Sequence, residues 1–492
     1  MCTSDESNWW IRILTPEYVA TTQELAKLPG KTKRPLCHIM GTQALRLNQA
    51  LLVYGVSYIS FIPNELLEMI FVETVKATIR ADEDYSSSCA LTRLRLRSRP
   101  ELLLTSVSQR WRAVALGMPL LWTEIRLFLR QNVDLVNLYL TRSQGQLLDM
   151  RFIGNHCDFH SQGLPEFDPD YLRISHIILL HVHVCRRLEV HGAFPFPKLL
   201  DGLKRIKAPM LEELMVHYPL NIPNSRHILF TEGLPSLTSV ELGNVSSISS
   251  DLFLSADRLT VLTLNGLWVS GLSPENFSSL LSHLTSLTHL TLIGEPVDYV
   301  RSMDIPLVEI PLLQTMVVKP GPNISRTYLP TLFRTIRAPV LRELALDFHA
   351  TTSSRDIQSL VDKLKRGAPP FPSVRLLTLC SRSMAYDGWH ALAHAFSGVT
   401  TLSVSKCIMN QLMGFLSCAG RRDAFPNLRT LLFDDVQFEW SLLIQLLQIR
   451  EAAGMPVREV KMRGFKKHAQ SELVGKLVAS LATYTPIVIG WT

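Results

Sequence analysis

The sequence lacks several features that would place it in a defined class of protein. Its eight cysteines include no C-x-x-C pair and no closely spaced even cluster, so neither a zinc ribbon nor a disulfide framework is indicated. No run of about 18 apolar residues occurs, and the first residues have neither the basic start nor the apolar core of a signal peptide. We therefore expect a protein of the cytoplasm, the nucleus or both, with no membrane association.

Signatures of the common enzyme classes are also absent. The chain has no G-x-x-x-x-G-K-[ST], G-x-S-x-G, H-E-x-x-H or G-x-G-x-x-G pattern. The segment His181–Cys185 alternates as a strand would and could place two imidazoles and a thiol on one face, but no second pair of metal ligands follows at a usable spacing. We expect a satisfied or solvent-facing strand there. For the whole chain, we expect a protein that is not an enzyme and has no cofactor and no bound metal.

Leucine is the residue that the sequence has in excess, with 81 of 492 residues. From residue 211 onward the frame L-x-x-L-x-L, with Val, Met or Phe allowed at its apolar places, returns ten times at intervals of about 27 residues, the period of leucine-rich repeats. The ten copies are Leu211/Leu214/Val216, Leu237/Val240/Leu242, Leu259/Leu262/Leu264, Leu287/Leu290/Leu292, Leu313/Met316/Val318, Leu341/Leu344/Leu346, Val374/Leu377/Leu379, Val399/Leu402/Val404, Leu428/Leu431/Phe433 and Val457/Val460/Met462.

The frame predicts a parallel sheet. The last two apolar residues of each copy alternate along a short strand and point to one side, so stacked copies share a continuous core. Helical spacing between frames, as at Trp389/Leu392/Phe396 and from Trp440 to Ile449, completes a strand-plus-helix repeat. We expect an α/β fold, with a curved solenoid over residues 211–492 and a linker with first degenerate repeats over 127–210. One degenerate copy could lie at Ile174/Ile177/Leu179, and an ordinary α/β domain with leucine-rich strands is the alternative.

A second organised region, residues 59–126, predicts a small helical domain that follows an unassigned N-terminal arm, residues 1–58. Pro63 suits a helix start, and Leu66, Leu67, Ile70 and Phe71 then share one helix face. A second helix is predicted where Val107 and Trp111 share a face. About 65 residues are too few for a large core, so this region needs the repeats or a partner.

These segments resemble an F-box. The matching motifs are I-P-x-E-L-L-x-x-I-F at 62–71, V-x-x-R-W-R-x-V-A at 107–115 and P-x-L-W-x-x-I at 119–125, in the right order and followed by leucine-rich repeats. The segment L-x-L-x-R-S at 138–143, followed by Q-L-L at 146–148, also resembles the first segment after the box in fungal-type F-box proteins. Together with the repeats, the resemblance covers most of the chain.

The resemblance implies that the helical domain binds a Skp-family adaptor, which joins it to a cullin scaffold and a RING ubiquitin ligase, while the repeats hold an unidentified protein substrate. The chain departs from the common pattern with Ile62 for Leu, Ser108 for Cys and a polar insert from about Lys76 to Pro100. Two alternatives stay open: the helical region only caps the repeats, and the chain is a leucine-rich scaffold with no ligase link. The positions that match the adaptor-binding motif are Ile62, Pro63, Leu66, Leu67, Ile70, Val107 and Trp111.

The frame also predicts which side chains the sheet turns away from its core. Over ten copies, these thirty positions hold six acids and three bases, although the whole chain has a formal charge of +7. Nucleic-acid binding relies on clustered Lys and Arg, so we expect this face to bind a protein segment and consider a nucleic-acid partner unlikely. The candidates for the substrate face are Glu213, Glu241, His289, Glu343, Asp347, Asp434 and Glu459.

Overall fold

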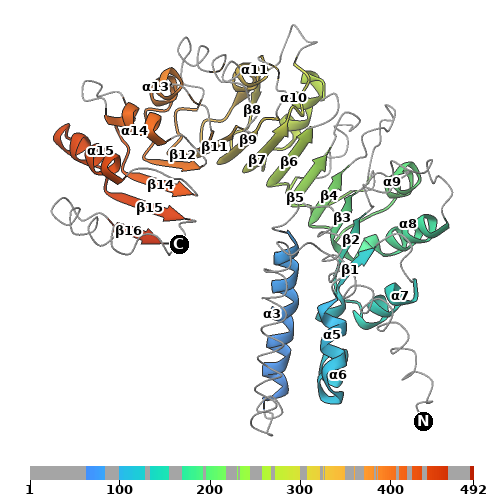
Figure 1. The fold of residues 1–492 in the computed structure, drawn as a ribbon. Helices are drawn as coiled ribbons and strands as arrows, with labels where there is room; N and C mark the ends of the chain where they lie inside the picture. The colour runs from blue at the N-terminus through green and yellow to red at the C-terminus, as the bar shows by residue number, and fades with distance from the viewer. Residues whose placement is uncertain are drawn as a thin grey trace, which may run out of the picture. The chain divides into compact units, whose positions relative to one another are not determined.

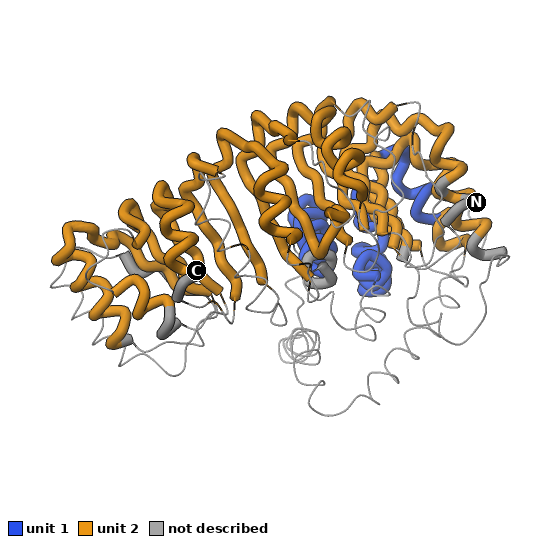
Figure 2. The backbone as a smooth tube through the Cα atoms, turned by 90° about the horizontal axis from the view of Figure 1, so that it is seen from above, with its two compact units in different colours: residues 1–123, 138–146 blue, residues 124–137, 147–492 orange. Residues whose placement is uncertain are grey.

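Two compact units make up the described part of the chain (Figure 2): a helical unit, from residues 1–123 and 138–146, and a repeat unit, from residues 124–137 and 147–492. The expected arm at residues 1–58 lies outside the described residues. The computed structural model describes residues 62–83, 99–127, 133–153, 169–191, 196–217, 230, 233–243, 257–266, 272–299, 307–321, 325, 327–348, 360, 371–381, 384, 386–405, 409–417, 424–434, 440–463 and 488–491.

The helical unit is built from short helices whose ends follow from the sequence. Pro100 occupies the first turn of α5, where a missing N–H costs nothing, and the Ser108 hydroxyl accepts a hydrogen bond from the Trp111 N–H (3.1 Å) at the start of α6. Leu67, Phe71 and Trp122 lie in its core, each 0% exposed. The elements are α3 (Asn64–Glu83), α5 (Pro100–Val107), α6 (Gln109–Leu116), η2 (Pro119–Trp122) and the second half of α7 (Val133–Arg142).

Helix α3 is longer than the sequence analysis predicts. We expected the polar insert to begin near Lys76 as a surface loop, but α3 continues to Glu83. Glu73 and Lys76, three residues apart, form an ion pair of 3.1 Å along the helix. That part of the insert therefore extends the helix, because its polar side chains suit an exposed helix face.

A parallel sheet of 14 strands runs through the repeat unit, and neighbouring strands follow one another in chain order (Figure 1). Helices cover one face of it, and the other face, here called the open face, carries no helix of the repeat unit in Figure 1. The strands are β1 (Glu124–Leu127), β2 (Leu148–Ile153), β3 (Cys185–His191), β4 (Glu213–His217), β5 (Ser239–Gly243), β6 (Val261–Gly266), β7 (His289–Gly294), β9 (Thr315–Lys319), β11 (Glu343–Asp347), β12 (Leu376–Cys380), β13 (Thr401–Ser405), β14 (Thr430–Asp434), β15 (Glu459–Arg463) and β16 (Val488–Trp491).

All ten predicted frames coincide with strands β4 to β15 of this sheet. Their thirty apolar residues are buried, each no more than 3% exposed, so the frame identifies the part of the core that the strands contribute. Threonine hydroxyls just before several strands also join adjacent repeats, as Thr260 does when it donates to the Thr238 carbonyl (3.1 Å). A parallel sheet of this kind is consistent with a curved repeat solenoid and fits a leucine-rich-repeat architecture.

Helices connect many of the strands. The predicted helices at 389–396 and 440–449 are confirmed as α13 and α15, and Gly454, with φ of +76°, follows the second. The helices of the repeat unit are α8 (Pro169–His181), α9 (Phe196–Lys204), α10 (Pro274–His283), α11 (Tyr328–Thr335), α13 (Tyr386–Ala395), α14 (Met409–Ser417) and α15 (Trp440–Ala452), with a small second sheet of β8 (Val308–Glu309) and β10 (Ile336–Arg337).

Two local predictions before residue 211 are wrong. The frame at Ile174/Ile177/Leu179 lies in helix α8, because residues three apart fall on one helix face as readily as they fit the first step of the frame. The segment His181–Cys185 is not a strand: α8 ends at His181, a 3₁₀ turn η4 (Val182–Val184) follows, and β3 begins at Cys185. The sheet itself starts much earlier, at Glu124.

Candidate functional site

The helical unit presents a surface of large apolar side chains. On α3, Leu66 is 49% exposed, Met69 64% and Ile70 45%. These residues are spaced i, i+3 and i+4, so they lie on one side of the helix. Val107 at the end of α5 is 59% exposed and Leu120 in η2 is 63% exposed. We call these five residues the apolar surface.

The predicted adaptor-binding residues divide between this surface and the layer beneath it. Leu66, Ile70 and Val107 belong to the apolar surface, and Pro63 is also exposed. Leu67 is fully buried and can only shape the surface from inside. Trp111 is half-buried, and its ring lies 4.9 Å from that of Phe71 in the core.

Ile62, the remaining predicted residue, is held in place by α6. The guanidinium of Arg110 donates to the Ile62 carbonyl and to Asn64 Oδ1, the latter at 3.0 and 2.8 Å. Arg110 therefore ties the start of α3 to α6. Met69 and Leu120 were missed by the sequence analysis, although the helical spacing of Met69 from Leu66 is a signal that could have found it.

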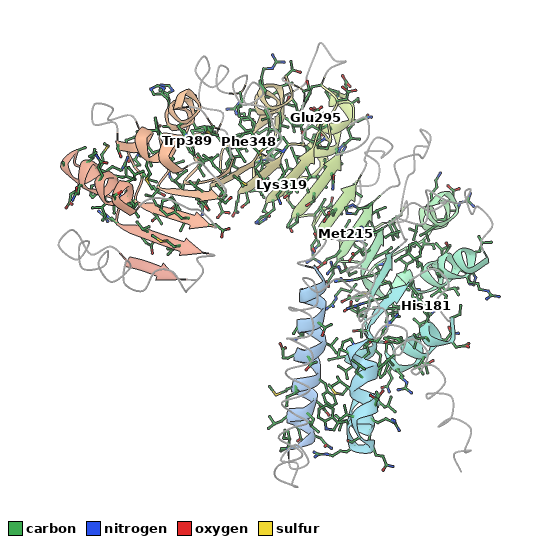
Figure 3. All side chains as sticks on the ribbon, in the orientation of Figure 1. His181, Met215, Glu295, Lys319, Phe348 and Trp389 are labelled. Atoms are coloured by element: carbon green, nitrogen blue, oxygen red, sulfur yellow. The ribbon has the colours of Figure 1, made fainter. Side chains whose placement is uncertain are left out.

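The open face of the sheet is the second candidate surface. The thirty predicted positions stay at least partly exposed wherever their side chains are described, with the exception of Gly243. Met215 on β4 and Lys319 on β9 mark two places on these strands in Figure 3. The sheet therefore turns these residues away from its core as predicted, while their role in substrate binding stays a prediction.

The seven substrate-face candidates differ in their surroundings. Some are engaged by neighbours: Glu213 with Arg187 (3.4 Å), Glu241 with His217 (3.1 Å) and Glu459 with Lys461 (3.0 Å). Glu343 accepts a hydrogen bond from Thr315 (3.3 Å), and His289 lies 2.8 Å from the Thr288 hydroxyl. Asp347 and Asp434 make no ion pair with any of the described side chains.

Sequence reasoning missed a row of charged residues on β1, β2 and β3, which precede the first predicted repeat. A signal was present, because these strands carry the same frame, with its leading leucine kept in the second copy and replaced by Trp and Cys in the first and third. The three copies are Trp122/Ile125/Leu127, Leu147/Met150/Phe152 and Cys185/Leu188/Val190.

Strand register brings those charges together into an ion-pair network. Arg126 and Arg151 lie on adjacent strands in register, and Glu124 Oε1 accepts from Arg126 at 2.9 Å and lies 3.8 Å from Arg151. Glu189 lies beside Arg151 (3.3 Å) and Arg187 (3.4 Å). Arg126, Arg151 and Glu189 are only 5 to 8% exposed, so their charges are largely removed from water and depend on this pairing.

A pair of imidazoles extends the network across β3, β4 and β5. The rings of His191 and His217 stack with centroids 4.3 Å apart, and their Nε2 atoms face Glu189 (2.8 Å) and Glu241 (3.1 Å). A side chain at Gly243 would collide with the His217 ring, since its Cβ would fall 2.6 Å from Nδ1. Glycine at position 243 therefore leaves the space that the His217 ring occupies.

The pKa of Glu189 reports the balance of forces in this network. Burial alone would raise the pKa of the carboxyl, but the hydrogen bond from His191 and the charges of His191, Arg151 and Arg187 lower it to about 2. Glu189 is therefore ionised at neutral pH. The negative charge of Glu189 therefore stabilises the packing of β2 against β3 through its ion pair with Arg151.

Other chemistry on these strands is limited. Burial, with a smaller contribution from the charge of Asp149, raises the pKa of the Cys185 thiol to about 12, so this thiol stays protonated and unreactive. Within the described ranges, no group of three or more His, Cys, Asp or Glu side chains is arranged to hold a metal ion. Among the described helices, none is both long and apolar enough to cross a membrane.

The first three strands leave the charge balance of the open face unchanged. They add three acids, Glu124, Asp149 and Glu189, and three bases, Arg126, Arg151 and Arg187. With the six acids and three bases of the predicted positions, the face holds nine acids and six bases, which is a balance of −3. The expectation that this face does not attract nucleic acid therefore extends to the full set of strands.

Comparisons with known proteins add little to this description. No protein-family model matches the sequence, and no curated protein matches it. Among solved structures, the chain is similar to a crystal structure of a Bacteroides fragilis protein, at 10% sequence identity and a TM-score of 0.33, over 65% of this chain and 82% of that one. A likeness at this level carries no argument about function, so the functional assignment depends on the two surfaces themselves.

Proposed function

We propose that the chain is a substrate receptor of a ubiquitin ligase. Its helical unit, an F-box, binds a Skp-family adaptor and through it a cullin scaffold, and the open face of its sheet holds the target protein. The observation that carries the proposal is the apolar surface, in which Leu66, Met69, Ile70, Val107 and Leu120 are 45 to 64% exposed.

Burial of the apolar surface would contribute to the free energy of a complex. Full burial of one such side chain contributes about 1.5–3 kcal/mol, and these five are about half exposed, so the gain is several kcal/mol before the entropy cost of association. Leu66, Met69 and Ile70 share one side of α3, and an exposed apolar patch is typical of an interaction site on a folded protein. The motif resemblance at 62–71, 107–115 and 119–125 names the partner.

Target binding at the open face is supported by the chemistry of the outward positions. Small polar side chains such as Thr263, Thr291 and Ser403 are mixed with apolar ones such as Val317 and Leu432, and no cationic groove is present along the described strands. This mixture suits hydrogen bonds and short apolar contacts with a protein segment. The rival function, a leucine-rich scaffold, uses the same face without the adaptor.

The test is a charge placed in the apolar surface. Leu66→Asp should abolish capture of a Skp-family adaptor, because burying an unpaired carboxylate costs of order 3 kcal/mol or more, which is over a hundredfold in affinity. The measurement is a pull-down and a titration with the purified adaptor. The melting temperature of the variant should match that of the unmodified chain, since Leu66 is half exposed already.

Val340→Asp is the matched control, because Val340 is 41% exposed and lies in the repeat unit. It receives the same charge at a comparable site and should keep adaptor binding. If Leu66→Asp captures the adaptor as well as the unmodified chain does, the ligase assignment is wrong. If Leu66→Asp instead lowers the stability of the repeats, the helical unit is a cap for the array.

A further inference from the structure

The segment 138–146 belongs to the helical unit although strand β1 separates it from the rest of that unit in the chain. It contains the L-x-L-x-R-S motif at 138–143. The apolar surface uses none of these residues. The contacts of Tyr139 and Arg142 lead toward the helices that carry it.

Tyr139 is the centre of these contacts. It is 1% exposed, and its hydroxyl donates to Oε1 of Glu101 on α5, itself 6% exposed. Its ring meets the Trp122 ring edge-on at 5.2 Å, and the Arg99 guanidinium lies 5.1 Å from its centroid. Burial and then the charge of Glu101 raise the pKa of Tyr139, so the hydroxyl keeps its proton and remains a donor.

Arg142 and Trp122 extend the contacts to α6. The Arg142 guanidinium lies 4.8 Å from the centroid of the Trp122 ring, and the Trp122 indole N–H donates to the Ala115 carbonyl (2.9 Å) near the end of α6. Ser143, which is 2% exposed, donates through its hydroxyl to the Leu140 carbonyl (2.9 Å) and so finishes α7. The segment therefore braces α5 through Glu101 and α6 through Trp122.

We infer that Tyr139 is a positioning residue for the apolar surface: segment 138–146 completes the helical unit, and adaptor affinity depends on it. The inference rests on the proposed function. A unit of this size is marginally stable by itself, and a ligand sees only the fraction of molecules in which the binding surface is formed. A substitution in segment 138–146 that destabilises α5 and α6 lowers the fraction of molecules with a formed surface, although the segment itself makes no contact with the adaptor.

The experiment uses the full chain with Tyr139→Phe, which keeps the ring and removes the hydroxyl. Glu101 then loses this hydrogen bond while it stays buried, so we expect hydrogen exchange of the α5 and α6 amides to become about tenfold faster. Affinity for a Skp-family adaptor should fall in the same variant.

Tyr328→Phe is the matched control, since Tyr328 on α11 is also 1% exposed and its hydroxyl has no hydrogen-bond partner among the described residues. It should change neither measurement. Unchanged exchange in α5 and α6 for Tyr139→Phe overturns the inference. So does a loss of protection throughout β4 to β15, which would make Tyr139 a support of the whole chain.

The two proposals fail in different ways. If the unmodified chain binds no Skp-family adaptor, the proposed function is wrong whatever the exchange data show. If it binds the adaptor but Tyr139→Phe binds equally well, the ligase assignment stands and the positioning role of Tyr139 is wrong.

Discussion

The two faces of the 14-stranded sheet follow different rules although the same strands make both. The helix-covered face carries the same apolar frame ten times, and every frame residue is no more than 3% exposed. The open face repeats nothing: its first strands carry an ion-pair network, and later strands carry small polar side chains and separate carboxylates such as Asp347 and Asp434. The covered face holds the fold together, and the side chains of the open face are free to vary.

The open face is itself divided. On β1 to β5, Glu124, Glu189, Glu213 and Glu241 are each engaged by a base or an imidazole of this chain. On β11 and β14, Asp347 and Asp434 form no ion pair within the described part of the chain. Charges on the first strands therefore contribute to stability, while Asp347 and Asp434 on the later strands are not held by an ion pair to any described residue.

The largest expected effect comes from the covered face. Leu290→Ala should lower the free energy of unfolding by about 2–5 kcal/mol, because it removes buried contacts and leaves a cavity between repeats that cannot collapse fully. The measurement is urea denaturation followed by circular dichroism. Leu66→Ala, at a 49% exposed position in the helical unit, is the comparison and should change stability by less than about 0.5 kcal/mol. Equal effects of the two substitutions would contradict the division between core and binding surface.

Acid should weaken the network on the first strands next. Because the pKa of Glu189 is lowered from 4.5 to about 2, its stabilising contribution is complete above pH 4.5 and is lost as the pH falls toward 2. That contribution is roughly 3 kcal/mol. Glu189→Gln should be less stable than the unmodified chain at pH 6, and the difference in melting temperature should shrink between pH 4.5 and pH 2.5. A difference that stays constant over this range would mean that the carboxylate is not held by its cationic neighbours.

The smallest expected effect is on the later strands of the open face. Asp434→Asn should change the free energy of unfolding by no more than about 0.5 kcal/mol, because an exposed carboxylate without an ion pair contributes little to stability. The measurement is the same denaturation experiment at neutral pH. A loss as large as that for Glu189→Gln would show that this carboxylate belongs to a stabilising network and would remove the contrast between the two halves of the face.

The repeat core could be predicted from the sequence because a short local pattern specifies each strand. Each frame needs only six residues, and its three apolar positions are buried by the same geometry in every copy. The first three strands were missed for a physical reason: Trp122 and Cys185 stand where leucine is expected, and the intervals between the copies vary. At Ile174/Ile177/Leu179 the apolar spacing fits a helix and a frame equally well, and the sequence offers no local signal to separate them.

The two candidate surfaces were only partly predictable, because they depend on packing between elements. Leu66 and Leu67 are neighbours in the sequence and equally apolar, yet one is 49% exposed and the other 0%, which the positions of α5 and α6 decide. The pairing of Arg151 with Glu189 depends on strand register across about forty residues of chain, which no local pattern encodes. Outward positions on the predicted strands could be named correctly, because alternation alone fixes them.

The place of Tyr139 in the chain has a consequence for synthesis. Trp122 and Glu101 leave the ribosome before the residue that covers them, and strand β1 comes between. At about 5–20 residues per second, the 24 residues from Thr123 to Gln146 take about one to five seconds to make. During that interval the nascent helical unit exposes an aromatic core that only the later segment can close. A nascent chain is therefore most exposed to chaperones, and most prone to aggregate, just before residue 146 emerges.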